Sequence, residues 1–349
     1  KIKKKKIIFF YHPGKKSTLI HLHYLDNLFS YFEKDYVVIH GHELIDYYNK
    51  NFFFVSHSFL IRWIFNIDIF FSLNVCDKFP KKSKNVYMHH DISTAPLVEN
   101  EKEKELYERL LNYDFIFVPD KKSLSMFKNF FLNNEKNKNI KIPEIFCVGY
   151  FKLDYLIERF KHHTNLEKQI VIAPSDYRHI SELSIFNSLK DIIKILLDKT
   201  DFKIIFRPHP ANRNSSKVLE IKKEFINKEN FFLDFSDDYY DIYSNSACLI
   251  TDISGTAFTY AYMTQRPIIF FSKINDSLDK FSYSKLDYFK DRKKIGLIAK
   301  SPEDVLKSVS QLEHISNEIK NTNKELLKKI DYLGESKKRI KTLVDKIVA

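Results

Sequence analysis

Short, uninterrupted apolar runs alternate with longer segments of helical periodicity along the whole chain. In the first half the runs are KKIIFFY, DYVVIHG, FFFVSHS, NVYMHH, YDFIFVPD and EIFCVGY. In the second half they are QIVIAPS, FKIIFRPHP, FFLDFS, ACLITD, PIIFFS and KIGLIA. Strands that are apolar on both faces are typical of a parallel sheet covered by helices on both sides. The pattern therefore predicts an α/β fold made of two doubly wound halves.

The second set of strands begins after a charged stretch, which indicates a domain boundary. We expect a first domain at residues 1–160, a second at 161–310 and a charged helical tail at 311–349. A length of 349 residues is enough for two hydrophobic cores. Residues 59–75 form the longest apolar stretch, but Arg62, Asn66 and Asp68 interrupt it, so it is too short to span a membrane. We expect a buried or half-buried helix there, with a helix lying in a membrane interface as the alternative.

The charge balance is basic, with 57 Lys and Arg against 45 Asp and Glu, a formal net charge of +12. Such a charge favours polyanionic partners or an anionic membrane surface, although codon bias towards Lys and Asn accounts for much of it. The basic residues are spread along the chain apart from residues 3–6, and no RNA-binding signature occurs, which argues against a nucleic acid polymer as partner.

The cysteines are too few and too scattered for a disulfide framework or a zinc site. Cys76, Cys147 and Cys248 lie far apart and no Cys-x-x-Cys pair occurs. The apolar run near the amino end is too short for a signal peptide. We expect a cytoplasmic protein, with the inner face of the cell membrane as the alternative location.

The polar turn after the ACLITD strand is suited to phosphate. It carries Asp252, Ser254, Gly255 and Thr256 directly before a helical run. Backbone N–H groups and hydroxyls at a helix amino terminus bind phosphate oxygens well, and glycine permits close approach. The alternative is ordinary capping of the helix by Ser254 or Thr256.

Two more turns follow strands of the second half. FRPHP places Arg207 at a strand end, where a guanidinium can clamp phosphate, and holds His209 between two prolines. APSDYRHI places Ser175 and Arg178 after the first strand of that half, with helix capping as the alternative. Because the carboxyl ends of parallel strands share one edge, we expect these turns to face the same ligand.

A fourth turn, YMHHDIST, follows a strand of the first half. His89, His90 and Asp91 offer an imidazole beside a carboxylate, the parts of a general base that acts near neutral pH. Adjacent histidines point to opposite faces of an extended chain, which disfavours a shared metal ion. We therefore expect one histidine of the pair to be structural.

Taken in order, the segments between residues 86 and 272 resemble the CDP-glycerol glycerophosphotransferase family, of the teichoic-acid polymerase and primase type with a GT-B fold. The resemblance depends on NVYMHHDIST, the Tyr-Asp segment at 113–114, VGYFKLDYL, IVIAPSDYR, FRPHP and LITDISGTAFTYAYMTQRPIIFF. The chain departs from the family pattern at Asp91, where the family has Gly, and at Phe151, where it has Pro. It also lacks a Lys that often follows the His turn.

The resemblance implies two Rossmann-like domains that face a central cleft, the first binding the acceptor and the second the nucleotide donor. Glycerol phosphate, or a related polyol phosphate, would pass from a CDP-alcohol to a hydroxyl of a polyanionic or glycan acceptor, and CMP would leave. His90 would take the proton, with His209 as the second catalytic residue. Ser254, Gly255 and Thr256, together with Arg207 and His209, would lie on the diphosphate. The full set of substrate-binding residues would be Ser175, Arg178, Arg207, Asp252, Ser254, Gly255, Thr256, His89 and Asp91. No cofactor is implied, and assistance by a divalent cation such as Mg²⁺ stays open. The alternative is a GT-B glycosyltransferase that uses a nucleotide sugar.

Overall fold

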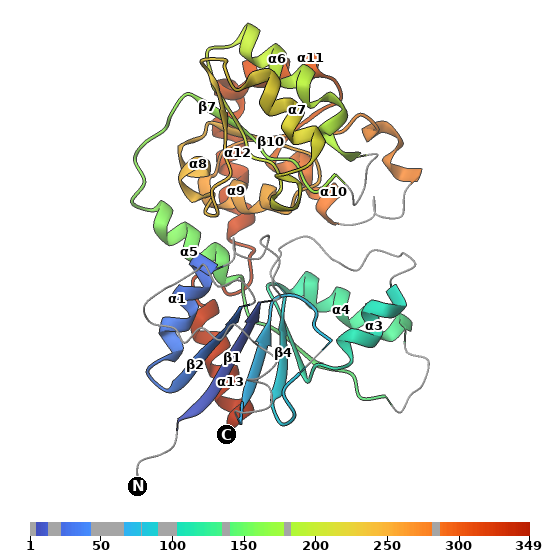
Figure 1. Cartoon of the computed structure of the whole chain (residues 1–349), viewed down its shortest axis with the longest axis vertical. Coiled ribbons are helices and arrows are strands. Elements are labelled where there is room, and N and C mark those ends of the chain that lie inside the picture. Colours follow the sequence, from blue (N-terminus) through green and yellow to red (C-terminus); the bar gives the residue numbers. More distant parts are fainter. Residues whose placement is uncertain are drawn as a thin grey trace. The chain divides into compact units, whose positions relative to one another are not determined.

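The computed structural model describes residues 5–12, 22–42, 66–77, 79–89, 103–134, 140–177, 183–280 and 287–349. The chain forms two compact units (Figure 1). Unit 1 comprises Lys1–Tyr155 together with Ile330–Ala349, and unit 2 comprises Leu156–Lys329.

Unit 1 is built on a six-stranded parallel sheet of order β2-β1-β3-β4-β5-β6. Its strands are β1 (Lys6–His12), β2 (Tyr36–His42), β3 (Ile69–Ser72), β4 (Lys84–Met88), β5 (Phe115–Val118) and β6 (Glu144–Cys147). The helices that accompany it are α1 (Leu22–Phe32), α3 (Glu103–Leu110), α4 (Lys121–Asn134), the start of α5 (Phe151–Phe160) and α13 (Ser336–Val348). Five of these strands lie at the predicted runs.

The sheet of unit 1 is apolar on both faces. Ile8 and Phe10 of β1 pack in one cluster with residues of α1 and α13, whereas Phe9 between them packs in another with Phe70 of β3. Consecutive apolar residues are needed because each neighbour points to the opposite face. The apolar run thus predicts a strand buried on both sides, as observed.

The third strand of unit 1 lies where a helix was expected. Residues 69–72, within the stretch 59–75, form β3 between β1 and β4, and all four are buried. The helix prediction is wrong at these residues, because a short apolar run buried in a sheet centre has the same composition as a buried helix. The strand predicted at 52–58 and residues 59–65 lie outside the described residues.

Unit 2 is built on a second six-stranded parallel sheet, of order β12-β11-β10-β7-β8-β9. Its strands are β7 (Gln169–Ile172), β8 (Lys203–Phe206), β9 (Phe231–Leu233), β10 (Cys248–Thr251), β11 (Ile268–Phe271) and β12 (Gly296–Ala299). Each lies within its predicted run, which confirms the strand pattern of this half.

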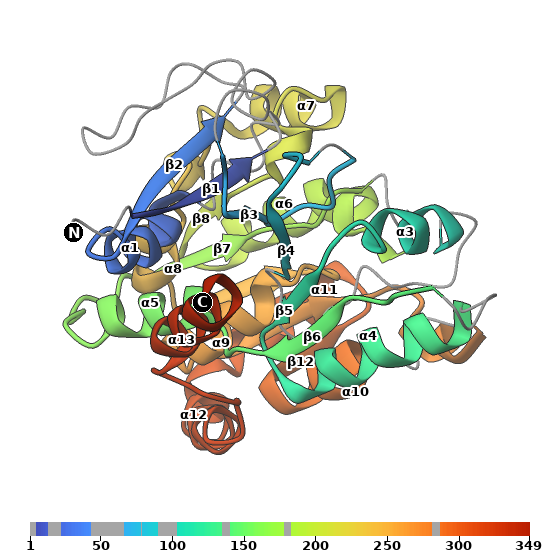
Figure 2. The same cartoon turned by 90° about the horizontal axis from the view of Figure 1, so that it is seen from below.

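The helices of unit 2 cover both faces of this sheet. They are α6 (Leu189–Lys199), α7 (Ser216–Phe225), α8 (Tyr240–Asn245), α9 (Thr256–Thr264), α10 (Asp287–Ile295), α11 (Pro302–Ser310) and α12 (Leu312–Leu327), with 3₁₀ turns η3 (Ile185–Ser188), η4 (Pro210–Asn212) and η5 (Asn275–Lys280). Residues of α6, α7 and α11 pack against β7, β8 and β10 in one apolar cluster. α9 is buried from Ala257 to Thr264. Figure 2 shows α12 almost end-on.

The segment 311–349 divides between the two units. α12 contacts α9 and α10 of unit 2, whereas α13 packs on unit 1. The carboxylate of Asp154 accepts hydrogen bonds from the backbone N–H groups of Gly334 (2.7 Å) and Ser336 (3.1 Å), so it caps α13. Gly149, with φ +85°, approaches Ser336 so closely that a Cβ would lie 3.0 Å from the Ser336 Cβ, so glycine is required there.

A helix that crosses a membrane must be long and apolar over its whole length. Within the described ranges, every helix is too short or too polar to cross a bilayer.

Candidate functional site

Three of the predicted turns lie side by side in unit 2. They follow β10, β7 and β8, which are neighbours in the sheet, so residues 252–256, 173–177 and 207–212 share its carboxyl edge. This is the edge at which open parallel sheets bind ligands. The sequence predicted this arrangement from strand ends alone.

The Asp252 carboxylate ties these turns together. It is fully buried, and its Oδ1 accepts hydrogen bonds from the backbone N–H groups of Ser175 (2.8 Å) and Ile253 (2.7 Å). Its Oδ2 accepts one from the Ile185 N–H (3.1 Å). Burial raises the pKa of Asp252, and these N–H donors act in the opposite direction. The substrate contact expected of Asp252 is not what the structure shows, since no part of the residue reaches solvent; its geometry is that of a positioning residue.

The start of α9 is not capped by a side chain. Gly255 is the N-cap residue and makes no side-chain capping bond, so the alternative of ordinary capping by Ser254 or Thr256 is wrong. Thr256 Oγ1 instead donates to Tyr243 Oη (3.2 Å), and Tyr288 Oη donates to the Ser254 carbonyl (3.2 Å). The positive end of the helix thus meets the same edge as the other turns.

Arg207 is held from the side of β9. The residue is 5% exposed, and its Nη1 donates to the Asp234 carboxylate and to Ser236 Oγ (3.0 Å). Its guanidinium also lies over the Tyr239 ring, 5.8 Å from the centroid. Nη2 has no hydrogen-bond partner among the described residues. Nη1 therefore fixes the position of the guanidinium, whereas the N–H groups of Nη2 make no hydrogen bond within the described residues.

His209 is oriented by its own turn. Its Nδ1 accepts a hydrogen bond from the Ala211 N–H (3.2 Å) at the start of η4. A neutral imidazole that accepts at Nδ1 carries its proton on Nε2. Asn212 of the same turn donates to Asp176 Oδ1 (3.0 Å), which joins the turn after β8 to the turn after β7.

The turn of unit 1 is only partly described. His89 is 3% exposed and packs edge-on against Phe127 at 5.5 Å, with its Nδ1 3.4 Å from Tyr87 Oη. The substrate contact expected of His89 conflicts with this placement in the core, whereas a structural role for one histidine of the pair agrees with it. His90, Asp91 and Arg178 lie outside the described residues.

Sequence reasoning missed the residues that hold the turns. Asp234 follows β9, so the strand-end criterion could have found it, but the turn of that strand was not considered. Tyr243 and Tyr288 lie inside helices and carry no local signal. In the described ranges no three His, Cys, Asp or Glu side chains gather in a way that could hold a metal ion.

The fold belongs to the GT-B-like class of two-domain α/β proteins. The chain is similar over 99% of its length to the wall teichoic acid polymerase TagF, with a TM-score of 0.68, 19% identity and 90% of that chain covered. It is also similar to a putative UDP-N-acetylglucosamine 2-epimerase from Listeria monocytogenes, with a TM-score of 0.60, 13% identity, and 99% and 96% of the two chains covered. These similarities confirm the predicted fold class.

Sequence comparison then gives the family. The model of the family CDP-Glycerol:Poly(glycerophosphate) glycerophosphotransferase matches residues 34–346, so the chain belongs to this family. It is 27% identical over 253 residues to the minor teichoic acid biosynthesis protein GgaB of Bacillus subtilis, covering 61% of this chain and 26% of that protein. It is 28% identical over 190 residues to the teichoic acid poly(glycerol phosphate) polymerase of Staphylococcus epidermidis, covering 48% and 24%. The chain thus spans about a quarter of the length of these relatives.

Proposed function

We propose that this chain transfers glycerol phosphate, or a related polyol phosphate, from a CDP-alcohol to a hydroxyl of a poly(glycerophosphate) or similar cell-surface acceptor. Family membership supports this reaction. The observation that carries it is the shared carboxyl edge of unit 2, where the uncapped start of α9 lies beside the turns of Arg207 and Ser175. A diphosphate needs such a concentration of donors, and phosphoryl transfer asks mainly for positioning and charge neutralisation.

The hydrogen-bonding groups at this edge each have a role in the proposed reaction. The N–H groups at the start of α9, the Ser254 hydroxyl and the unused Nη2 donors of Arg207 would bind the diphosphate oxygens. The Thr256 hydroxyl would join them by exchanging its bond to Tyr243 Oη for one to the diphosphate. His209 would donate a hydrogen bond from its Nε2–H to the phosphate that leaves as part of CMP, and so stabilise the charge that develops there. The acceptor hydroxyl attacks the distal phosphorus and gives its proton to His90, and the bond between that phosphorus and the bridging oxygen breaks.

The same proposal covers the charge of the acceptor and the place in the cell where the reaction occurs. A net charge of +12 supports a polyanionic acceptor and contact with an anionic membrane surface. A cytoplasmic position on the inner membrane face would place the enzyme where such acceptors and CDP-alcohols meet.

The test compares His209→Asn with His314→Asn. Asparagine can keep the capping bond to the Ala211 N–H while it removes the Nε2 donor, and His314 is an exposed residue of α12. CMP release from CDP-glycerol is measured with a glycerol-phosphate-primed acceptor, and donor binding by thermal shift. We expect kcat/KM to fall about 10²-fold or more in His209→Asn and to stay unchanged in His314→Asn.

Two results would contradict the proposal. Failure of the folded protein to bind any CDP-alcohol or to release CMP would remove the donor assignment. Stronger stabilisation by a UDP-, GDP- or CMP-sugar than by CDP-glycerol or CDP-ribitol would favour a GT-B glycosyltransferase instead.

A further inference from the structure

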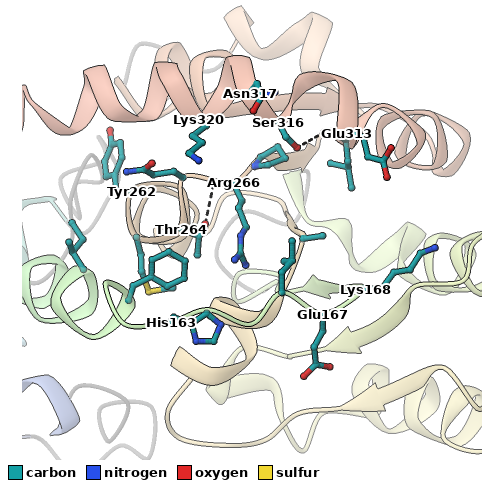
Figure 3. Close-up of a pocket in the computed structure, with 18 of the residues that line it drawn as sticks. His163, Glu167, Lys168, Tyr262, Thr264, Arg266, Glu313, Ser316, Asn317 and Lys320 are labelled. Carbon is teal, nitrogen blue, oxygen red and sulfur yellow. Dashed lines mark hydrogen bonds between the residues drawn. The ribbon is translucent and has the colours of Figure 1, made fainter.

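Unit 2 contains a cavity of about 910 Å³ on the edge of its sheet opposite to the candidate phosphate turns (Figure 3). Residues that line it directly precede the strands β7, β8, β10 and β11, namely Lys168, Phe202, Ala247 and Pro267. The strands between the two edges have four residues each, so the edges are about 13 Å apart at about 3.3 Å per residue. The cavity is therefore separate from the donor turns, and its volume is typical of a small-molecule site.

About half of the residues that line the cavity are apolar. These apolar residues come from the end of α5, the segment that follows it, the end of α9 and one side of α12, and include Ile157, Phe160, Leu166, Met263, Leu312 and Leu327. Leu166 is 61% exposed, so its side chain is open to contact with an occupant. Met263, Leu312 and Leu327 are already buried, so an occupant with an apolar body would cover mainly Leu166 and the half-buried Ile157 and Phe160.

Two cations lie in the same cavity. Arg266 Nη1 donates to the carbonyl oxygens of Ser244 and Ser246, both at 2.7 Å, and its guanidinium lies over the Phe160 ring at 5.5 Å. These contacts fix its position. Lys320 of α12 lines the cavity from another side, and no hydrogen bond or ion pair engages it within the described part of the chain.

The acidic residues of the lining do not neutralise these cations. In Figure 3 the carboxylates of Glu167 and Glu313 point away from Arg266 and Lys320. Glu167 is paired with Lys203 at 3.1 Å. Lys161 and Lys168 are themselves paired with acids outside the lining, Glu158 and Asp201. The charge that faces the cavity is therefore positive.

We propose that this cavity binds an anionic amphiphile, a molecule with one phosphate or carboxylate head and an apolar chain. Lys320 and Arg266 bind the head, and the apolar walls from Leu166 to Leu327 bind the chain. A small inorganic anion would leave Leu166 exposed to water, and a neutral amphiphile would leave Arg266 and Lys320 without a counter-ion. The site lies outside the proposed transferase chemistry, so it stands or fails independently of that reaction.

The test measures binding of octyl phosphate by isothermal titration calorimetry below its critical micelle concentration. Inorganic phosphate and octyl glucoside serve as the head and the chain alone, and each should bind at least about tenfold more weakly. Lys320→Glu reverses the charge inside the cavity and should weaken octyl phosphate about tenfold or more. Lys324→Glu makes the same change one turn further along α12, at an exposed residue that does not line the cavity, and should weaken octyl phosphate less than Lys320→Glu does.

A variant of the apolar wall tests the contacts to the chain of the ligand. Leu166→Ser removes an exposed apolar side chain, so it leaves the fold intact and should weaken octyl phosphate about threefold to tenfold. Equal affinities in Lys320→Glu and Lys324→Glu would overturn the proposal. So would binding of inorganic phosphate or octyl glucoside as tight as that of octyl phosphate. CMP release should be the same in Lys320→Glu as in the parent chain.

Discussion

Replacement of Asp252 by Asn should destabilise unit 2 although the two side chains have almost the same shape. The amide Oδ1 can keep the bonds from Ser175 and Ile253, but its Nδ2 would face the N–H of Ile185, which then loses its acceptor. A buried N–H without an acceptor costs about 1–3 kcal/mol. Removal of a buried charge offsets a part of this cost. We expect the free energy of unfolding to fall by about 2 kcal/mol at pH 7.

The size of this difference should depend on pH. Burial raises the pKa of Asp252 above its ordinary value of 3.8, so the folded chain holds the proton to a higher pH than the unfolded chain. The stabilisation from such a group is complete below pH 3.8 and is lost as the pH rises through the folded pKa. The amide in Asp252→Asn carries no such proton. The advantage of the parent chain over this variant should therefore be larger near pH 4 than at pH 7, by about 1.4 kcal/mol for each pH unit that separates the folded and unfolded pKa values.

Urea unfolding with amide hydrogen exchange at Ser175 and Ile185 measures both effects. Asp241→Asn on the exposed side of α8 is the matched control, since surface substitutions change stability by less than about 0.5 kcal/mol. The reasoning is refuted if both variants unfold at the same urea concentration and the Ile185 amide exchanges at the parental rate.

Three further predictions concern the hydrogen bonds of Asp154 and Arg207 and the burial of the cysteines. Asp154→Ala removes the cap of α13 and should lower the stability of unit 1 by about 1–2 kcal/mol, visible as faster proteolytic release of the carboxyl-terminal helix; release at the parental rate would contradict this. Arg207→Lys keeps a cation beside Asp234 but loses the Nη2 donors, so kcat/KM for the donor should fall about 10–10²-fold with stability retained; an unchanged kcat/KM would exclude Arg207 from the donor site. Burial raises the pKa of Cys147 to about 11, so Ellman's reagent at about pH 8 should label it only after denaturation, as it should the other two buried cysteines; rapid labelling of the native chain would disprove their burial.

Much of the candidate site could be predicted because it depends on strand ends. In a parallel sheet the carboxyl ends lie at one edge, so the sequence positions of Ser175, Arg207 and Gly255 were enough to predict neighbouring turns. Side-chain direction was not predictable in the same way. Asp252 turns inward to N–H groups from segments far away in the chain, and His89 turns into an aromatic core. Each direction depends on partners that no local pattern contains.

By itself, the sequence determined the class of fold and most of its strands, because burial on both faces of a parallel sheet requires short runs of consecutive apolar residues. Only the tertiary structure decided that residues 69–72 form a strand, that Asp234 holds Arg207 and that α13 returns to unit 1 under the cap of Asp154. These contacts join residues up to 182 positions apart. They exist because packing brings complementary groups together, a condition that the order of residues in a short segment cannot express.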